Sequence, residues 1–120
     1  SLKVRITATG SLAEGSITKT MTLPSRSKVH LSVFWTYERS NARFCGIRIY
    51  INDTLVHNSW WSAKCDYASE TASKWYKSGV DISEYAGQEV TIKIAGLGQA
   101  YDVYDYTDVW FDHITIAGKD

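Results

Sequence analysis

Apolar and polar residues alternate with a period of two along most of this chain, which is the pattern of half-buried strands. The runs are rich in Val, Ile, Thr and aromatic residues, which suit a pleated sheet surface. No long segment has a helical period. The expected strands lie at residues 3–9, 17–23, 29–36, 47–51, 90–94 and 112–116.

Polar and glycine-containing segments separate these runs. Residues 52–54, Asn-Asp-Thr, lie between two apolar segments and predict a hairpin. Residues 81–87 predict a single helical turn that stops at Gly87. Gly96 and Gly98 are interpreted as the end of the strand at 90–94. Two segments break the alternation, 58–79 and 99–108, and long irregular segments of compact domains tend to carry function.

Six or seven short strands without a long helix predict an all-β fold, an antiparallel β-sandwich or barrel. The length of 120 residues indicates one domain over residues 1–120. The chain opens with Ser1 rather than Met, so we expect a module that was processed or excised from a larger protein.

Charge excludes one class of partner and composition suggests another. Thirteen basic residues balance thirteen acidic ones, which argues against nucleic acid. No apolar run is long enough to insert into a membrane. Five Trp, eight Tyr and three Phe are more aromatic residues than a small core needs. We therefore expect some of them to be displayed for binding.

Two cysteines flank the predicted hairpin. Cys45 and Cys65 would approach each other if the flanking strands return side by side, and a disulfide would then close a loop of about 20 residues. Two buried free thiols are the alternative.

Five segments, in order along the chain, resemble the galactose-binding-like jelly-roll superfamily, which includes carbohydrate-binding modules of secreted glycoside hydrolases. They are 15–24, 29–35, 46–56, 81–92 and 109–116. The segment at 81–92, Asp-Ile-Ser-Glu-Tyr-Ala-Gly-Gln-Glu-Val-Thr-Ile, is the most specific match. The resemblance implies a jelly-roll sandwich and an extracellular or cell-surface location, as part of a larger protein. The superfamily also includes adhesion and structural domains.

The resemblance further implies a structural Ca²⁺ ion, because family members often ligate one through an acid of the last strand. Asp112 takes that position and shares the alternation of Ile114 and Ile116, so we expect it to point inward. Glu14 is the expected second carboxylate. Hydrogen bonds to the backbone, or an arginine partner, are the alternative for Asp112. His113 departs from the family pattern, where a second acid is common.

Glycan recognition needs flat aromatic faces, because the C–H face of a pyranose is apolar, together with polar groups that bind its hydroxyls. The two irregular segments and the hairpin supply such residues: Trp60, Trp61, Tyr101, Tyr104 and Tyr106, with Asp102, Asp105, Asn58 and Arg48 as polar partners. The alternative is that these aromatics hold loops onto the sandwich or contact another chain. Asp102, Asp105 and Asp108 are spaced by three, which fits no EF-hand loop, and we interpret them as a solvated acidic loop; the alternative is that they bind a second calcium ion.

Catalysis is not expected, because the chain has no zinc motif, nucleophile elbow or phosphate-binding loop. The sequence therefore predicts a non-catalytic, lectin-like module that binds a glycan or polysaccharide. The alternative is a structural or adhesion subunit of a fibre, pilus or virion that associates with copies of itself.

Overall fold

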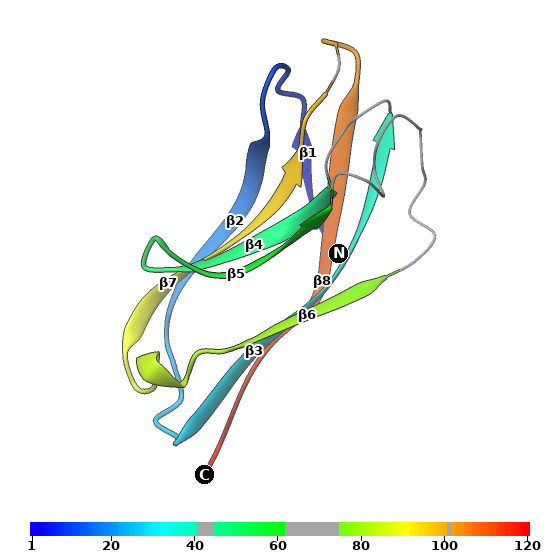
Figure 1. Cartoon of the computed structure of the whole chain (residues 1–120). Helices are drawn as coiled ribbons and strands as arrows, with labels where there is room; N and C mark the ends of the chain where they lie inside the picture. The colour runs from blue at the N-terminus through cyan, green and yellow to red at the C-terminus, as the bar shows by residue number, and fades with distance from the viewer. Residues whose placement is uncertain (41–44, 62–74, 101) are drawn as a thin grey trace.

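The computed structural model describes residues 1–40, 45–61, 75–100 and 102–120 (Figure 1). Within these ranges the chain forms eight strands and one short 3₁₀ turn. In order they are β1 (Leu2–Ile6), β2 (Ala13–Thr22), β3 (Lys28–Ser40), β4 (Cys45–Ile51), β5 (Thr54–Trp61), β6 (Tyr76–Asp81), η1 (Ser83–Tyr85), β7 (Glu89–Gly98) and β8 (Tyr106–Lys119).

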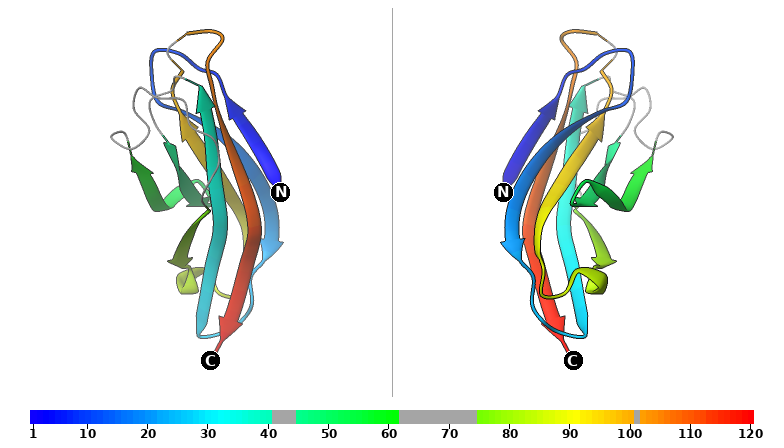
Figure 2. Two further views of the ribbon diagram at one scale, coloured as in Figure 1. Left: turned by 90° about the vertical axis from the view of Figure 1, so that its right-hand side faces the viewer. Right: turned by 90° about the vertical axis from the view of Figure 1, so that its left-hand side faces the viewer.

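The strands form two four-stranded sheets that pack face to face. One sheet has the order β1-β8-β3-β6 and the other β2-β7-β4-β5, and every recorded strand pair is antiparallel. Figure 2 looks onto the broad face of each sheet in turn, with the other sheet behind it, and β3 and β8 are the longest strands. The predicted all-β antiparallel sandwich is confirmed.

Alternating side chains of three strands fill the space between the sheets. In β3 the inward row is Val29, Leu31, Val33 and Trp35, and none of these is more than 1% exposed. Trp35 stacks on Tyr76 with ring centroids 4.8 Å apart, and its indole N–H donates to the Ser78 hydroxyl at 3.0 Å. Burying this large ring with its polar atom bonded avoids the penalty of an unpaired donor.

The inward rows of β4 and β7 pack against that layer, and their members are Ile47, Ile49, Ile51, Val90, Ile92 and Ile94. The period of two in the sequence predicted both rows.

The predicted hairpin joins β4 to β5 through a two-residue turn. Asn52 and Asp53 both have positive φ, 49° and 65°, as a type I′ turn requires. Asn52 also holds the neighbouring β7: its backbone N–H donates to the Thr91 carbonyl at 2.9 Å, and its side-chain oxygen accepts from the Thr91 N–H at 2.9 Å. The single turn at 81–87 is confirmed as η1, followed by Gly87 at φ 74°.

Several strand boundaries differ from the prediction. Strands β2, β3 and β8 are longer than the predicted runs at 17–23, 29–36 and 112–116. Tyr76–Asp81 forms β6, which begins inside the segment 58–79 that was expected to be irregular and ends where the helical turn was expected to begin. Strand β7 continues through Gly98 instead of stopping before Gly96. A Cβ atom at Gly96 would lie 2.8 Å from Val109, and one at Gly98 would lie 2.8 Å from Thr107. These glycines therefore allow the two sheets to approach closely and do not end the strand.

A β-bulge in β8 overturns the inward direction predicted for Asp112. The register of β8 against β3 shifts between Ser32 and Phe34, and His113 has a φ of 48°. Phe111 before the bulge is buried, whereas Asp112 is half-buried on the outer face and opposite Phe34. The extra residue reverses the alternation, so Asp112 and Ile114 do not share a face.

The described residues include no helix that is long and apolar enough to cross a bilayer.

Candidate functional site

The turn between β7 and β8 displays an aromatic ring at one end of the sandwich. Tyr104 is 89% exposed and Val103 is 76% exposed. The backbone N–H of Tyr104 donates to the Asp102 carboxylate at 2.8 Å, and the N–H of Asp102 donates to the Asp105 carboxylate at 3.2 Å. Asp105 N–H donates to the Asp102 carbonyl at 3.1 Å. Three local hydrogen bonds thus fix the backbone that carries the Tyr104 ring.

The chain leading into this turn is tied to the start of the molecule. Ala100 forms a bridge with Thr9, and its N–H donates to the Ala8 carbonyl at 2.9 Å. The turn is therefore anchored on both sides, by this bridge and by the first residues of β8.

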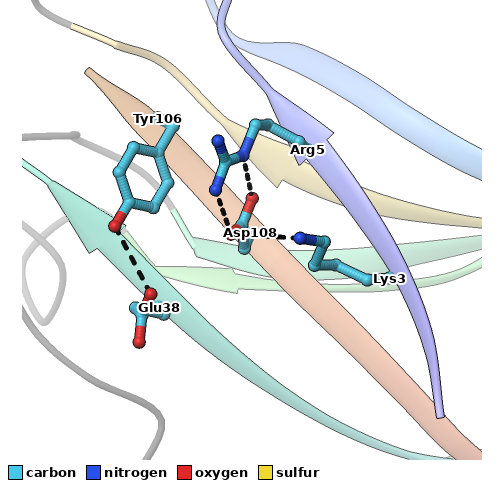
Figure 3. A network of polar contacts seen from close by, with 5 residues as sticks. All are labelled: Lys3, Arg5, Glu38, Tyr106 and Asp108. Atoms are coloured by element: carbon cyan, nitrogen blue, oxygen red, sulfur yellow. Dashed lines mark hydrogen bonds and ion pairs between the residues drawn. The ribbon is translucent and has the colours of Figure 1, made fainter. Parts of the chain in front are cut away.

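Tyr106 belongs to a polar network on the outer face of the β1-β8-β3-β6 sheet (Figure 3). Arg5 and Asp108 are directly opposite on β1 and β8 and form a bidentate pair, with Arg5 Nε 2.7 Å and Nη2 2.8 Å from the two carboxylate oxygens. Lys3 lies 3.9 Å from the same carboxylate, which is only 2% exposed. The bond and charge of Asp108 raise the pKa of Arg5.

Arg5 also covers one face of the Tyr106 ring, with the guanidinium carbon 4.3 Å from the ring centroid. The Tyr106 hydroxyl donates to Glu38 at 3.3 Å. Desolvation, followed by the charge of Glu38, raises the pKa of Tyr106. Tyr106 is thus part of an intramolecular network rather than a displayed ring.

Arg48 and Asn58 come together on the outer face of the other sheet. Arg48 Nε donates to the Asn58 side-chain oxygen at 3.2 Å, and its Nη1 donates to Glu14 at 3.0 Å. The Tyr50 hydroxyl donates a short hydrogen bond to the same Glu14 oxygen. Lys93 lies over the Tyr50 ring, 4.3 Å from its centroid. We call these five residues the Glu14 cluster.

Opposing effects set the pKa of Glu14. Desolvation alone raises it, but the hydrogen bonds from Tyr50 and Arg48 and the charges of Arg48 and Lys93 outweigh desolvation, so the pKa of Glu14 is lowered. Desolvation and the neighbouring carboxylate raise the pKa of Tyr50. The cluster therefore holds Glu14 ionised between a phenol and two cations.

The structure does not bring the predicted calcium ligands together. Glu14 lies on the outer face of the β2-β7-β4-β5 sheet, whereas Asp112 lies on the outer face of the opposite sheet. Asp112 accepts from the His113 N–H at 2.9 Å and from the Ser1 hydroxyl at 3.3 Å. The bond from His113 is the main cause of its lowered pKa. Glu14 and Asp112 do not fit a shared ion, and the described residues contain no group of three or more His, Cys, Asp or Glu that suits a metal.

The three spaced aspartates also separate. Asp102 and Asp105 stabilise the turn, while Asp108 is buried in β8 beneath Arg5. The interpretation of all three as one acidic loop is wrong for Asp108.

The side chains of four predicted residues, Trp60, Trp61, Tyr101 and Cys65, lie outside the described part of the structure. Trp60 and Trp61 are the last residues of β5, where they pair with Gly46 and Cys45 of β4. Tyr101 and Cys65 lie outside the described residues, so the disulfide between Cys45 and Cys65 stays a prediction.

Sequence reasoning missed Arg5 and its pairing with Asp108. The available signal was the alternation of Lys3 and Arg5 with Val4 and Ile6, which places both cations on the outer face of an expected strand. Their acidic partner, Asp108, is near the other end of the sequence, and only the pairing of β1 with β8 identifies it.

Comparison of the chain with family models, with curated proteins and with solved structures finds no match.

Proposed function

We propose that this domain is a non-catalytic, extracellular carbohydrate-binding module in which Tyr104 provides the principal stacking surface. The observation that carries the proposal is the 89% exposure of a ring whose backbone is fixed by hydrogen bonds to two aspartates. Exposed aromatic surface on a preorganised turn binds an apolar face with little loss of loop entropy.

The polar surroundings of Tyr104 suit sugar hydroxyls. A carboxylate can accept about four hydrogen bonds, and the side chain of Asp102 accepts the Tyr104 N–H. The Asp102 carboxylate therefore has capacity for hydroxyl donors beside the ring. Arg48 and Asn58 lie on the outer face of the β2-β7-β4-β5 sheet, and we propose them as further polar contacts away from the Tyr104 turn.

Strand order supports the finer part of the fold prediction. Eight strands distributed as β1-β8-β3-β6 and β2-β7-β4-β5 are compatible with a double-sheet jelly roll. The galactose-binding-like assignment, the location in a larger extracellular protein, the Cys45–Cys65 disulfide and a structural Ca²⁺ ion remain parts of this proposal.

A glycan array probed with the purified domain, with calcium and with EDTA, tests the proposal. We expect binding to a related set of glycans, and loss of the signal in EDTA would show that an ion supports the site. Tyr104→Ala should weaken binding by about 30-fold, the loss of about 2 kcal/mol expected for a central aromatic contact. Tyr104→Phe should retain most of the binding, because it keeps the ring.

Val103→Ala is the matched control, because Val103 is the neighbouring residue in the same turn and is also largely exposed. It should leave affinity unchanged. The proposed site would be overturned if no glycan binds in either calcium or EDTA, or if a folded Tyr104→Ala variant binds as well as the unaltered domain.

A structural or adhesion role is the second candidate. One observation favours it: part of β8 has an edge without a strand partner among the described residues.

A further inference from the structure

The sandwich is open along one side, where an apolar groove runs between β2 and the C-terminal half of β8. The groove has a volume of about 510 Å³, and its apolar lining includes Ile17, Met21, Leu31, Ile92, Ile114 and Ile116. Ile114 is 40% exposed. Exposed apolar surface of this kind, between two sheets, marks a place where another chain can pack.

The backbone at the rim of this groove is also available. Strand β1 pairs with β8 only from Thr107 to Phe111. Residues 112–119 pair with β3 on their other side, and within the described part of the chain no strand pairs with their β1 side. An unpaired strand edge beside an apolar groove is suited to strand addition.

The β-bulge makes this edge complementary to itself. In β8 after the bulge, Ile114, Ile116 and Gly118 lie on the groove side, since Ile116 and Gly118 pair with the buried Leu31 and Val29. Thr115, Ala117 and Lys119 lie on the outer side. If two copies pair antiparallel about Ile116, the two Ile116 residues meet on the groove side. Ile114 of one copy then lies opposite Gly118 of the other, which Pro24 and Arg26 cover on that side.

The same register matches opposite charges. Ser32 pairs with Thr115 and Phe34 with Asp112, so residues 113 and 114 both lie opposite the single residue Val33. The two residues of the bulge therefore count as one position when strands are paired. In the antiparallel pair about Ile116, the bulge of one copy lies opposite Gly118 of the other. The next pair is then Asp112 of one copy and Lys119 of the other, and both side chains lie on the outer side. Twofold symmetry forms this ion pair twice.

We propose that the partner of this edge is a second copy of the same chain, added antiparallel through residues 112–119 to make a continuous eight-stranded sheet across the dimer. Ser1 is the one residue that must move, because it lies beside Asp112 and donates to it at 3.3 Å. Lys119 of the second copy then pairs with the Asp112 carboxylate in place of Ser1. Asp120 does not continue along the edge, since Arg26 holds it at 2.9 Å.

Sedimentation equilibrium and light scattering between roughly 10 μM and 1 mM test the proposal, because a short strand interface gives a weak dimer. We expect the mass to rise from 13.5 kDa toward twice that value with concentration. Lys119→Asp should weaken the dimer about tenfold, because it places like charges opposite each other at two positions. Asp112→Lys should do the same, and the double variant should restore dimerisation.

Two further variants keep the result interpretable. Lys77→Asp makes the same charge change on β6, at the opposite edge of the sheet, and should leave the dimer intact. Ile116→Lys should abolish the dimer, and tryptophan fluorescence should show that the monomer remains folded. A monomer throughout the concentration range overturns the proposal. So does a dimer that persists in Ile116→Lys, or failure of the double charge reversal to restore what each single reversal weakens.

Discussion

Two arginine–carboxylate pairs lie on opposite outer faces of this sandwich, and they differ in burial and in the strands they join. Arg5 and Asp108 are directly opposite on adjacent strands, and the carboxylate is 2% exposed. Arg48 and Glu14 come from β4 and β2, with β7 between them, and the Glu14 carboxylate is 26% exposed. The same chemistry therefore serves two purposes.

The buried pair fixes the register of β1 against β8, since a one-residue slip would leave Asp108 buried without its partner. The Arg48–Glu14 pair reaches across β7 and shares its carboxylate with the Tyr50 hydroxyl, and because Glu14 is more exposed than Asp108 the pair should contribute less to stability. Burial of the acidic side chain, 2% exposed in Asp108 and 26% in Glu14, rather than burial of the arginine decides how much each pair contributes to stability.

The largest effect is expected at the buried pair. Asp108→Ala removes two charge-assisted hydrogen bonds and leaves Arg5 and Lys3 without their shared counter-charge. We expect the free energy of unfolding to fall by about 2 kcal/mol. Urea denaturation should show a midpoint lower by roughly 1 M. Glu89→Ala, an exposed carboxylate at the start of β7, is the control, and an equal effect in both variants would contradict the comparison.

A smaller and pH-dependent effect is expected at Glu14. Because the folded-state pKa is lowered from 4.5, the pair contributes stability above that pH and loses it as pH falls through the folded value. At pH 7, Glu14→Gln should lower the free energy of unfolding by less than about 1 kcal/mol. Denaturation curves of the two proteins should converge as pH falls from about 5 to 3. A constant difference over this range would argue against an ionised Glu14 as the cause.

The smallest effect is expected from Tyr50→Phe, which removes one donor to Glu14 and leaves Arg48 in place. Unfolding should change little. The pKa of Glu14, measured by NMR titration of its side-chain carbon, should rise, because a hydrogen bond to the ionised form is lost. An unchanged or lower pKa would show that the cations alone set the state of Glu14.

The sequence predicted the core better than it predicted the surface. Inward rows of β3, β4 and β7 follow from alternation alone, and the Asn52–Asp53 turn follows from the residues that tolerate positive φ. The inward rows and the turn depend only on residues that are close to one another in the sequence.

The errors have a common physical cause. The bulge at His113 inserts one residue without any sequence mark, and everything inferred for Asp112 from alternation changes face. Gly96 and Gly98 resemble a turn until Val109 and Thr107 of the other sheet are placed beside them. Arg5 and Asp108 meet across about a hundred residues. Each of these depends on a strand that is distant in sequence.

The position of β8 has a consequence for synthesis of the protein. It is the last strand in the chain, yet it lies inside its sheet, between β1 and β3. During synthesis, the edges of β1 and β3 that pair with β8 remain unpaired until β8 has left the ribosome, because no earlier strand lies between them. A nascent chain stalled before Tyr106 should therefore remain sensitive to protease, because β1 and β3 still lack the strand that joins them.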